Sequence, residues 1–204
     1  KGASLATLRD AALTMIDQHP EKTHWSLPSG VAFGSGATRG KLGVLFPGQG
    51  SQYTGMFRDL ACQFPEVLDA LAAGDRVFAQ ERPDLGSQRL SDFIYPHPAF
   101  TDDAKREQEE ALKATDIAQP ALGAISLGAL NLVNYFGITP EAAAGHSYGE
   151  LPALCGAGRL QPESLHRLSN VRGRLMACRN GHSDRGSMLA VQASEEVVAK
   201  LVGE

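Results

Sequence analysis

Cysteine is scarce in this sequence: Cys62, Cys155 and Cys178 are the only 3 among 204 residues. They are widely separated, with neither the paired spacing of a zinc site nor that of a redox-active Cys-x-x-Cys motif. An odd, scattered set of cysteines is typical of reduced thiols, so we predict a cytoplasmic protein. We expect each thiol to be a small buried apolar side chain rather than a nucleophile.

Positive charge is not in excess either: 19 Lys and Arg residues stand against 23 Asp and Glu residues, a net charge of −4. A protein that binds nucleic acid or an anionic membrane through its charge has an excess of basic residues. The sequence also lacks a run of about 18 apolar residues, the length that a membrane-spanning helix needs. We therefore predict no nucleic-acid partner and no membrane association.

The residues that are present, 43% hydrophobic and 21% charged, are typical of a folded globular protein. The first residue is Lys1 rather than Met, and no signal-peptide pattern follows it. We therefore expect a piece of a longer polypeptide. Its three expected parts are an interdomain linker with an N-terminal helix over residues 1–40, a large α/β subdomain over 41–185, and the incomplete beginning of a small subdomain over 186–204.

The order of apolar runs and helical periodicity predicts a parallel α/β core. Residues 41–46 are typical of a buried strand, and residues 115–136 have apolar side chains all round, as a buried helix does. A second short strand is expected at 142–145. Further helices are predicted at residues 3–18, 57–73, 87–94, 102–113 (charged and solvated), 151–157, 161–179 and 194–202. A polar connection is predicted at 74–86 and a strand at 186–192.

The second strand leads into Gly145-His146-Ser147-Tyr148-Gly149, a Gly-x-Ser-x-Gly sequence between a strand and a helix. This is the pattern of a nucleophile elbow, in which a strained turn lifts the serine hydroxyl off the sheet and side chains at both glycine positions would collide. The backbone N–H of Tyr148 would then face an oxyanion that develops beside Ser147. An ordinary tight turn also explains the two glycines, but it gives no reason for the serine.

A glycine-rich loop, Pro47-Gly48-Gln49-Gly50-Ser51-Gln52, follows the first strand. It lacks the Lys-Ser/Thr pair of a P-loop and the spacing of a dinucleotide fingerprint, so nucleotide binding is not predicted. Gly48 and Gly50 let the backbone approach a ligand closely, and Gln49 would offer its amide as a second oxyanion donor.

Arg172 lies within an apolar stripe of the helix predicted at 161–179. The members of the stripe are Leu165, Leu168, Val171, Leu175 and Met176. A guanidinium group in such a stripe is costly unless an anion pairs with it. The pattern leaves two interpretations open. One is structural, with a partner such as Glu150 or a position at the stripe edge where the charge reaches water; the other is a site for a substrate carboxylate.

Four motifs, in this order, resemble malonyl-CoA:acyl-carrier-protein transacylases and the acyltransferase domains of type I polyketide and fatty acid synthases. They are Phe46 to Gln52, Gln119-Pro120-Ala121-Leu122, Gly145 to Glu150 and Arg172-Gly173-Arg174-Leu175-Met176. The resemblance extends over residues 41–204. Tyr148 after the serine is similar to the residue in iterative synthases of the enediyne and polyunsaturated fatty acid type. The family resemblance implies a hydrolase-like core with a smaller, ferredoxin-like subdomain.

The same resemblance implies roles for individual residues. Ser147 would be acylated by a thioester, and the amides of Gln49 and Tyr148 would form its oxyanion hole. Gln119 would help to order the site. Arg172 would hold the malonyl carboxylate.

Histidine is the catalytic residue that the sequence does not place. The family pairs its serine with a histidine after the arginine motif, and the expected position lies beyond Glu204. His146 adjoins the serine but should point away from it, since successive strand residues face opposite sides, and we assign it to substrate binding. The poor candidates for the base are His97, His166 and His182.

The resemblance therefore implies a ping-pong acyltransferase that takes malonyl from malonyl-CoA and gives it to the phosphopantetheine thiol of an acyl carrier protein. No metal ion and no bound cofactor are expected. The other expected partners are the remaining half of the domain and a neighbouring ketosynthase domain. Two alternatives stay open: an α/β-hydrolase-type esterase or thioesterase, and an inactive scaffold fragment that lacks its catalytic histidine.

Overall fold

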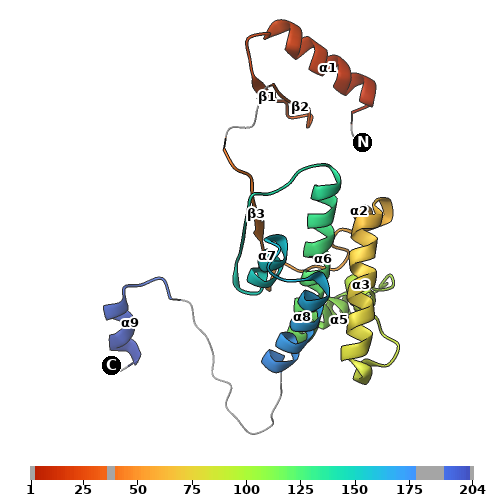
Figure 1. Cartoon of the computed structure of the whole chain (residues 1–204), viewed down its shortest axis with the longest axis vertical. Coiled ribbons are helices and arrows are strands. Elements are labelled where there is room, and N and C mark those ends of the chain that lie inside the picture. Colours follow the sequence, from red (N-terminus) through yellow and green to blue (C-terminus); the bar gives the residue numbers. More distant parts are fainter. Residues whose placement is uncertain (1–2, 36–39, 178–190, 203–204) are drawn as a thin grey trace.

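The computed structural model describes residues 3–35, 40–177 and 191–202. A short parallel sheet pairs β3 (Gly43–Phe46) with β4 (Ala142–Gly145). Figure 1 shows β3 beside a group of helices that includes the long helix α6 (Thr115–Tyr135). The helices between the two strands form the crossover that a parallel pair requires. The predicted parallel α/β core is confirmed.

The two strands end side by side, with Phe46 opposite Gly145. The loops that follow them are therefore neighbours at the carboxyl edge of the sheet, where ligands bind in open α/β sheets. Phe46 is only 5% exposed, whereas Leu45 is 81% exposed. The expectation of a buried strand is therefore wrong at Leu45, because no described element covers that side of the sheet.

The central helix α6 lies against α3 (Pro65–Glu81) and α8 (Pro162–Ala177). It is long and apolar enough to cross a membrane, but 72% of its most apolar window is buried inside the fold. This burial makes α6 the core helix of a packed domain, as its all-round apolar pattern predicted. The core around it includes Val67, Leu71, Phe78, Leu90, Ile94, Leu112, Ala121 and Ile125.

The helix α3 extends through the segment that the sequence predicted to be a polar connection. Residues 57–73 were expected to form one helix, but the chain is extended at Phe64, and Pro65 begins a new helix that continues to Glu81. Gly74 lies buried in its middle, where an added Cβ would lie 3.1 Å from the Cβ of Ala124. A glycine that suggested a loop is in fact a close helix contact with α6.

The remaining elements are short or exposed. The charged helix is confirmed as α5 (Asp102–Lys113), whose acidic and basic residues form exposed pairs three residues apart. The others are α2 (Arg58–Gln63), η1 (Pro83–Leu85), α4 (Leu90–Ile94), η2 (Ser147–Gly149), α7 (Glu150–Gly156) and α9 (Glu195–Val202).

Residues 3–35 contain a helix and a short hairpin. The expected helix is α1 (Leu5–Gln18), and it has no buried residue. An antiparallel hairpin of β1 (His24–Ser26) and β2 (Ala32–Gly34) follows it, with the rings of Trp25 and Phe33 stacked at 5.5 Å. The sequence did not predict this hairpin, because its strands are too short to show alternation.

The apolar stripe predicted on α8 faces outward over much of its length. Leu165 is buried, but Leu175 and Met176 are 69% and 58% exposed. The side that faces the core is instead made of Leu165, His166, Ser169, Asn170 and Gly173. Small and polar residues occupy it because α8 approaches α6 closely, and a Cβ on Gly173 would lie 2.9 Å from the Cα of Asp116.

The cysteines differ from expectation at one described position. Cys62 is exposed rather than buried, whereas Cys155 is half-buried, and burial raises the pKa of its thiol. Cys178 and most of the strand predicted at 186–192 lie outside the described residues. Within the described residues no group of three potential metal ligands occurs.

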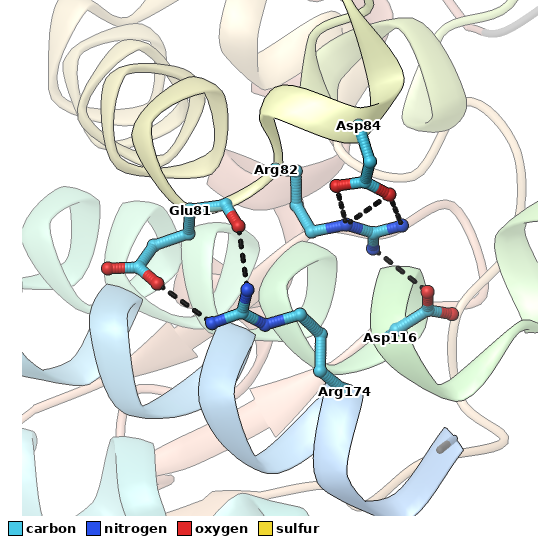
Figure 2. A network of polar contacts seen from close by, with 5 residues as sticks. All are labelled: Glu81, Arg82, Asp84, Asp116 and Arg174. Carbon is cyan, nitrogen blue, oxygen red and sulfur yellow. Dashed lines mark hydrogen bonds and ion pairs between the residues drawn. The ribbon is translucent and has the colours of Figure 1, made fainter. Parts of the chain in front are cut away.

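A network of charged residues joins α3, α6 and α8 (Figure 2). The guanidinium group of Arg82 is almost fully buried and donates to Asp116 on α6 at 2.8 Å and to both oxygens of Asp84. Arg174 on α8 donates to the backbone oxygen and the carboxylate of Glu81. The pKa of Asp84 is lowered chiefly by its hydrogen bonds from Arg82. These contacts fix the N-terminal turn of α6.

We predict that Arg82→Met lowers the free energy of unfolding by about 3 kcal/mol, because it leaves Asp116 largely buried without its cation. Urea unfolding measures the change. The matched control is Arg167→Met, which removes an exposed pair with Glu163 and should cost less than about 0.5 kcal/mol. Equal effects of the two substitutions would contradict a structural role for the network.

His166 is a second buried polar residue between α3 and α8. Its side chain is 2% exposed, and within the described part of the chain neither ring nitrogen has a hydrogen-bond partner. Burial, with a contribution from the charge of Arg76, lowers the pKa of His166 to about 4. The histidine is therefore neutral at pH 7 and is a core residue.

Because its folded-state pKa is depressed, His166 should make stability depend on pH. Between pH about 6.5 and about 4 the unfolded chain binds the proton that the folded chain excludes, so stability falls as pH falls. The loss should reach about 3 kcal/mol at the acid end of this window. Urea unfolding at several pH values gives the free energy of unfolding of the unsubstituted chain and of His166→Leu. Between pH about 6.5 and about 4 this free energy should fall more steeply with falling pH in the unsubstituted chain. An identical pH dependence of the two proteins would refute the burial of a neutral histidine.

Candidate active site

Ser147 occupies a strained turn between β4 and α7. Its φ of 54° is in the left-handed region, which within the described residues only one other non-glycine residue, Phe57, also adopts. Such a conformation costs about 1–3 kcal/mol in a non-glycine residue, so the surrounding structure must enforce it. The serine itself is exposed.

Two glycines enforce the turn by allowing backbone segments to touch. A Cβ on Gly145 would overlap the carbonyl group of Gly149, and a Cβ on Gly149 would overlap the carbonyl oxygen of Phe46 at the end of β3. No side chain fits at either position without displacing backbone. The spacing of glycines around Ser147 thus has a direct steric cause.

The glycine-rich loop after β3 lies against the same turn. A Cβ on Gly48 would lie 2.7 Å from the backbone oxygen of His146, 3.0 Å from its Nδ1 and 3.4 Å from the Cβ of Ser147. The amide of His146 also donates to the oxygen of Phe46 at 3.1 Å. The two loops that the sequence singled out are therefore in contact, and Gln49 follows directly after the contact point.

Side-chain amides connect this loop to α6 and α8. Gln49 donates from Nε2 to Thr115 at 3.0 Å and accepts from Gln119 Nε2 at 3.4 Å. Gln119 is fully buried and also contacts the sulfur of Met176 at 3.4 Å. The structure thus brings together Gln49 and Gln119, which the sequence separates by 70 residues.

Tyr148 points in the opposite direction from Ser147, into the protein. Its side chain is fully buried, its hydroxyl is 2.6 Å from Oγ of Ser169 on α8, and burial raises the pKa of the phenol. Ser169 was not found from the sequence, since a serine within a helix gives no distinctive signal.

Arg172 lies one helical turn beyond Ser169 and is half-buried. Both residues are on α8, and Ser169 contacts the hydroxyl of Tyr148. In the described ranges Arg172 forms no hydrogen bond or ion pair, so Glu150, one structural partner that the sequence left open, is not paired with it.

The histidines are dispersed. His146 is exposed beside Gly48, His97 lies in the exposed loop after α4, His166 is buried in the core, and His182 is outside the described residues. Within residues 3–35, 40–177 and 191–202, no histidine ring is hydrogen-bonded to Ser147.

The arrangement has the elements of acyl-transfer chemistry: an exposed serine on a strained turn, backbone amides beside it and an available guanidinium group. Residues 44–202 match the model of a family described as the acyl transferase domain. Among curated relatives, the chain is 35% identical over 194 residues to one of the subunits of a polyunsaturated fatty acid synthase from Thraustochytrium sp., covering 91% of this chain.

Solved structures of acyltransferases are also similar to this chain. The acyltransferase domain from the second module of the salinomycin polyketide synthase is 33% identical, with a TM-score of 0.62 over 87% of this chain. A malonyl-transacylase of a type II polyketide synthase, in complex with its acyl carrier protein, is 34% identical with a TM-score of 0.55 over 67%.

The chain spans 7% of the fatty acid synthase polypeptide, 36% of the salinomycin domain and 39% of the transacylase. The match nevertheless includes both strands, the serine turn and the helix of Arg172. With the family model matched over residues 44–202, the chain belongs to the acyl transferase domain family.

Proposed function

We propose that this chain contributes the nucleophile of a malonyl-CoA:acyl-carrier-protein acyltransferase within a polyketide or fatty acid synthase. The observation that carries the proposal is the exposed Ser147, held at a φ of 54° between two glycines that admit no side chain. A strand, a strained turn and a helix in this order support a nucleophile elbow. The membership of the chain in the acyl transferase domain family gives the elbow its reaction class.

In the first half-reaction, Ser147 Oγ attacks the thioester carbonyl of malonyl-CoA and its proton passes to a general base. The carbonyl oxygen becomes an oxyanion, which the amides of Gln49 and Tyr148 stabilise. When the C–S bond breaks, coenzyme A leaves as its thiol and the malonyl group remains as an ester on Ser147. We assign the base to a histidine outside residues 1–204.

In the second half-reaction, the thiol of the carrier protein's phosphopantetheine arm attacks this ester and Ser147 regains its proton. The acyl group ends on the carrier, and no net oxidation or hydrolysis occurs. No metal ion or bound cofactor enters either step. A carrier-protein partner is consistent with the related transacylase that was solved in complex with an acyl carrier protein.

Arg172 supplies the charge that selects a malonyl group. It is half-buried, has no anionic partner among the described residues, and extends from the same helix as Ser169. A guanidinium group can bind a carboxylate through two parallel hydrogen bonds. The selected acyl group would thus be held at both ends, by its ester on Ser147 and by its free carboxylate.

Gln119 and His146 act around these groups. Gln119 holds the side chain of Gln49, and thereby the loop whose amide faces the oxyanion. His146, exposed beside Gly48, would contact the bound thioester. The ferredoxin-like small subdomain, the rest of the acyltransferase domain and a ketosynthase domain complete the proposed assembly.

Ser147→Ala should abolish acyl-enzyme formation, because the other hydroxyl group of the turn, on Tyr148, is buried. Intact-protein mass spectrometry after mixing with malonyl-CoA measures the adduct. The chain should be tested alone and supplemented with the part of a related acyl transferase domain that it does not span. The matched control is Ser164→Ala, which alters an exposed serine of α8. An adduct that persists in Ser147→Ala, or is absent from the unsubstituted protein in both settings, refutes the proposal.

Arg172→Ala should shift acyl preference away from carboxylated groups. Loss of a charge-assisted hydrogen bond predicts a fall of about 10- to 100-fold in malonyl relative to acetyl loading. Competition between malonyl-CoA and acetyl-CoA, read by the mass of the Ser147 adduct, gives the ratio. Arg167→Ala is the control, since this arginine pairs with Glu163 at the surface. An unchanged ratio in Arg172→Ala would exclude a carboxylate-binding role.

A further inference from the structure

The side chain of Tyr148 fills a niche formed by α6 and α8. Its hydroxyl is 2.6 Å from Ser169 Oγ, and the whole side chain is buried. On the α6 side the niche is open only because residue 123 is glycine: a Cβ there would overlap the phenol oxygen of Tyr148 and lie 3.2 Å from Ser169 Oγ. Three segments of the chain therefore meet at one hydroxyl group.

The direction of the hydrogen bond follows from the second contact of Ser169. Its hydroxyl donates to the backbone oxygen of Leu165 at 2.7 Å, so its oxygen is left to accept from Tyr148. A buried phenol without a partner is costly, and this acceptor satisfies it. Burial also raises the pKa of Tyr148, so the phenol remains a donor across the neutral range.

The hydrogen bond joins the two parts of the site that act on an acyl group. Tyr148 directly follows Ser147, and its backbone amide is the proposed oxyanion donor. Ser169 precedes Arg172 by three residues on α8, so the two residues lie on the same side of the helix one turn apart. Movement of the phenol relative to Ser169 would therefore change the distance between the serine turn and the guanidinium group.

We propose that the hydrogen bond from Tyr148 to Ser169, seated against Gly123, is a positioning device that holds the Ser147 turn at a fixed distance from α8 and so sets the reach of Arg172 toward the acyl group. Neither the phenol nor Ser169 touches a reacting atom. The selection of carboxylated acyl groups rests on the proposed function; the fixing of the turn does not.

Local hydrogen exchange tests the fixing of the turn without any need for activity. The amides of His146 and Gly149 are hydrogen-bonded, to the oxygens of Phe46 and His146, and report on its opening. In Tyr148→Phe and in Ser169→Ala their exchange should become about fivefold faster, the value of one hydrogen bond. Exchange in the core of α3, residues 67–78, should not change. Unchanged turn amides, or equal acceleration throughout the chain, would overturn the proposal.

Gly123 provides a rescue test of the niche. Gly123→Ala places a methyl group onto the phenol oxygen and should accelerate exchange at His146 and Gly149 more than Tyr148→Phe does. In the double variant Gly123→Ala/Tyr148→Phe the collision is removed, so exchange should return to the value of Tyr148→Phe alone. A double variant no better than Gly123→Ala would show that the contact between the two residues does not hold the turn.

Acyl selectivity tests the link to Arg172. Ser169→Ala should lower malonyl loading about fivefold more than acetyl loading, because only the carboxylated group depends on the reach of Arg172. Equal loss with both donors, or no loss, would overturn this link. If the unsubstituted protein forms no ester on Ser147, the proposed function fails, and the exchange measurements still decide whether the hydrogen bond fixes the turn.

Discussion

The close crossing of backbone at the carboxyl edge of the sheet is the constraint on which the site depends. An added methyl group on Gly145 would meet main-chain atoms across its own turn, and one on Gly149 or Gly48 would meet main-chain atoms of another segment. Where these segments are in contact, the serine adopts a φ of 54°, in the left-handed region. The strain is held by the surroundings rather than by Ser147 itself.

Glycine also permits close approach between the helices. Gly173 allows α8 to approach the first turn of α6, and Gly74 allows α3 to approach the middle of α6 at Ala124. Tight packing of this kind leaves little room for apolar side chains, so polar contacts complete the interface. Arg82, Asp116 and Arg174 form one such group, and Tyr148 with Ser169 forms another. The amide pair of Gln49 and Gln119 then joins the helices to the loop beside the serine.

The sequence predicts these features unevenly, for physical reasons. α6, β4 and α5 have strong local patterns, and the structure confirms them. The boundaries of α3 were mistaken because Gly74 has a tertiary role that its neighbours do not show. The orientation of α8 was mistaken because small residues, not large apolar ones, face the core. Motifs predicted Gln49, Gln119, Ser147 and Arg172 as site residues, and the apolar stripe pointed to Arg172 as well. Ser169, Gly123 and Arg82 could not be predicted in this way, because their roles depend on partners distant in the chain.

The long sequence separation between these partners affects how the chain folds. Gln49 meets Gln119 across 70 residues, and the whole helical crossover lies between the two strands that pair. Contacts between residues so far apart close large loops. The chain must lose the conformational entropy of these loops before the contacts can stabilise the fold. The long helix α6 can form early from local interactions, but the serine turn cannot. The strained geometry of the Ser147 turn would therefore arise among the last events of folding, when the two ends of the crossover meet.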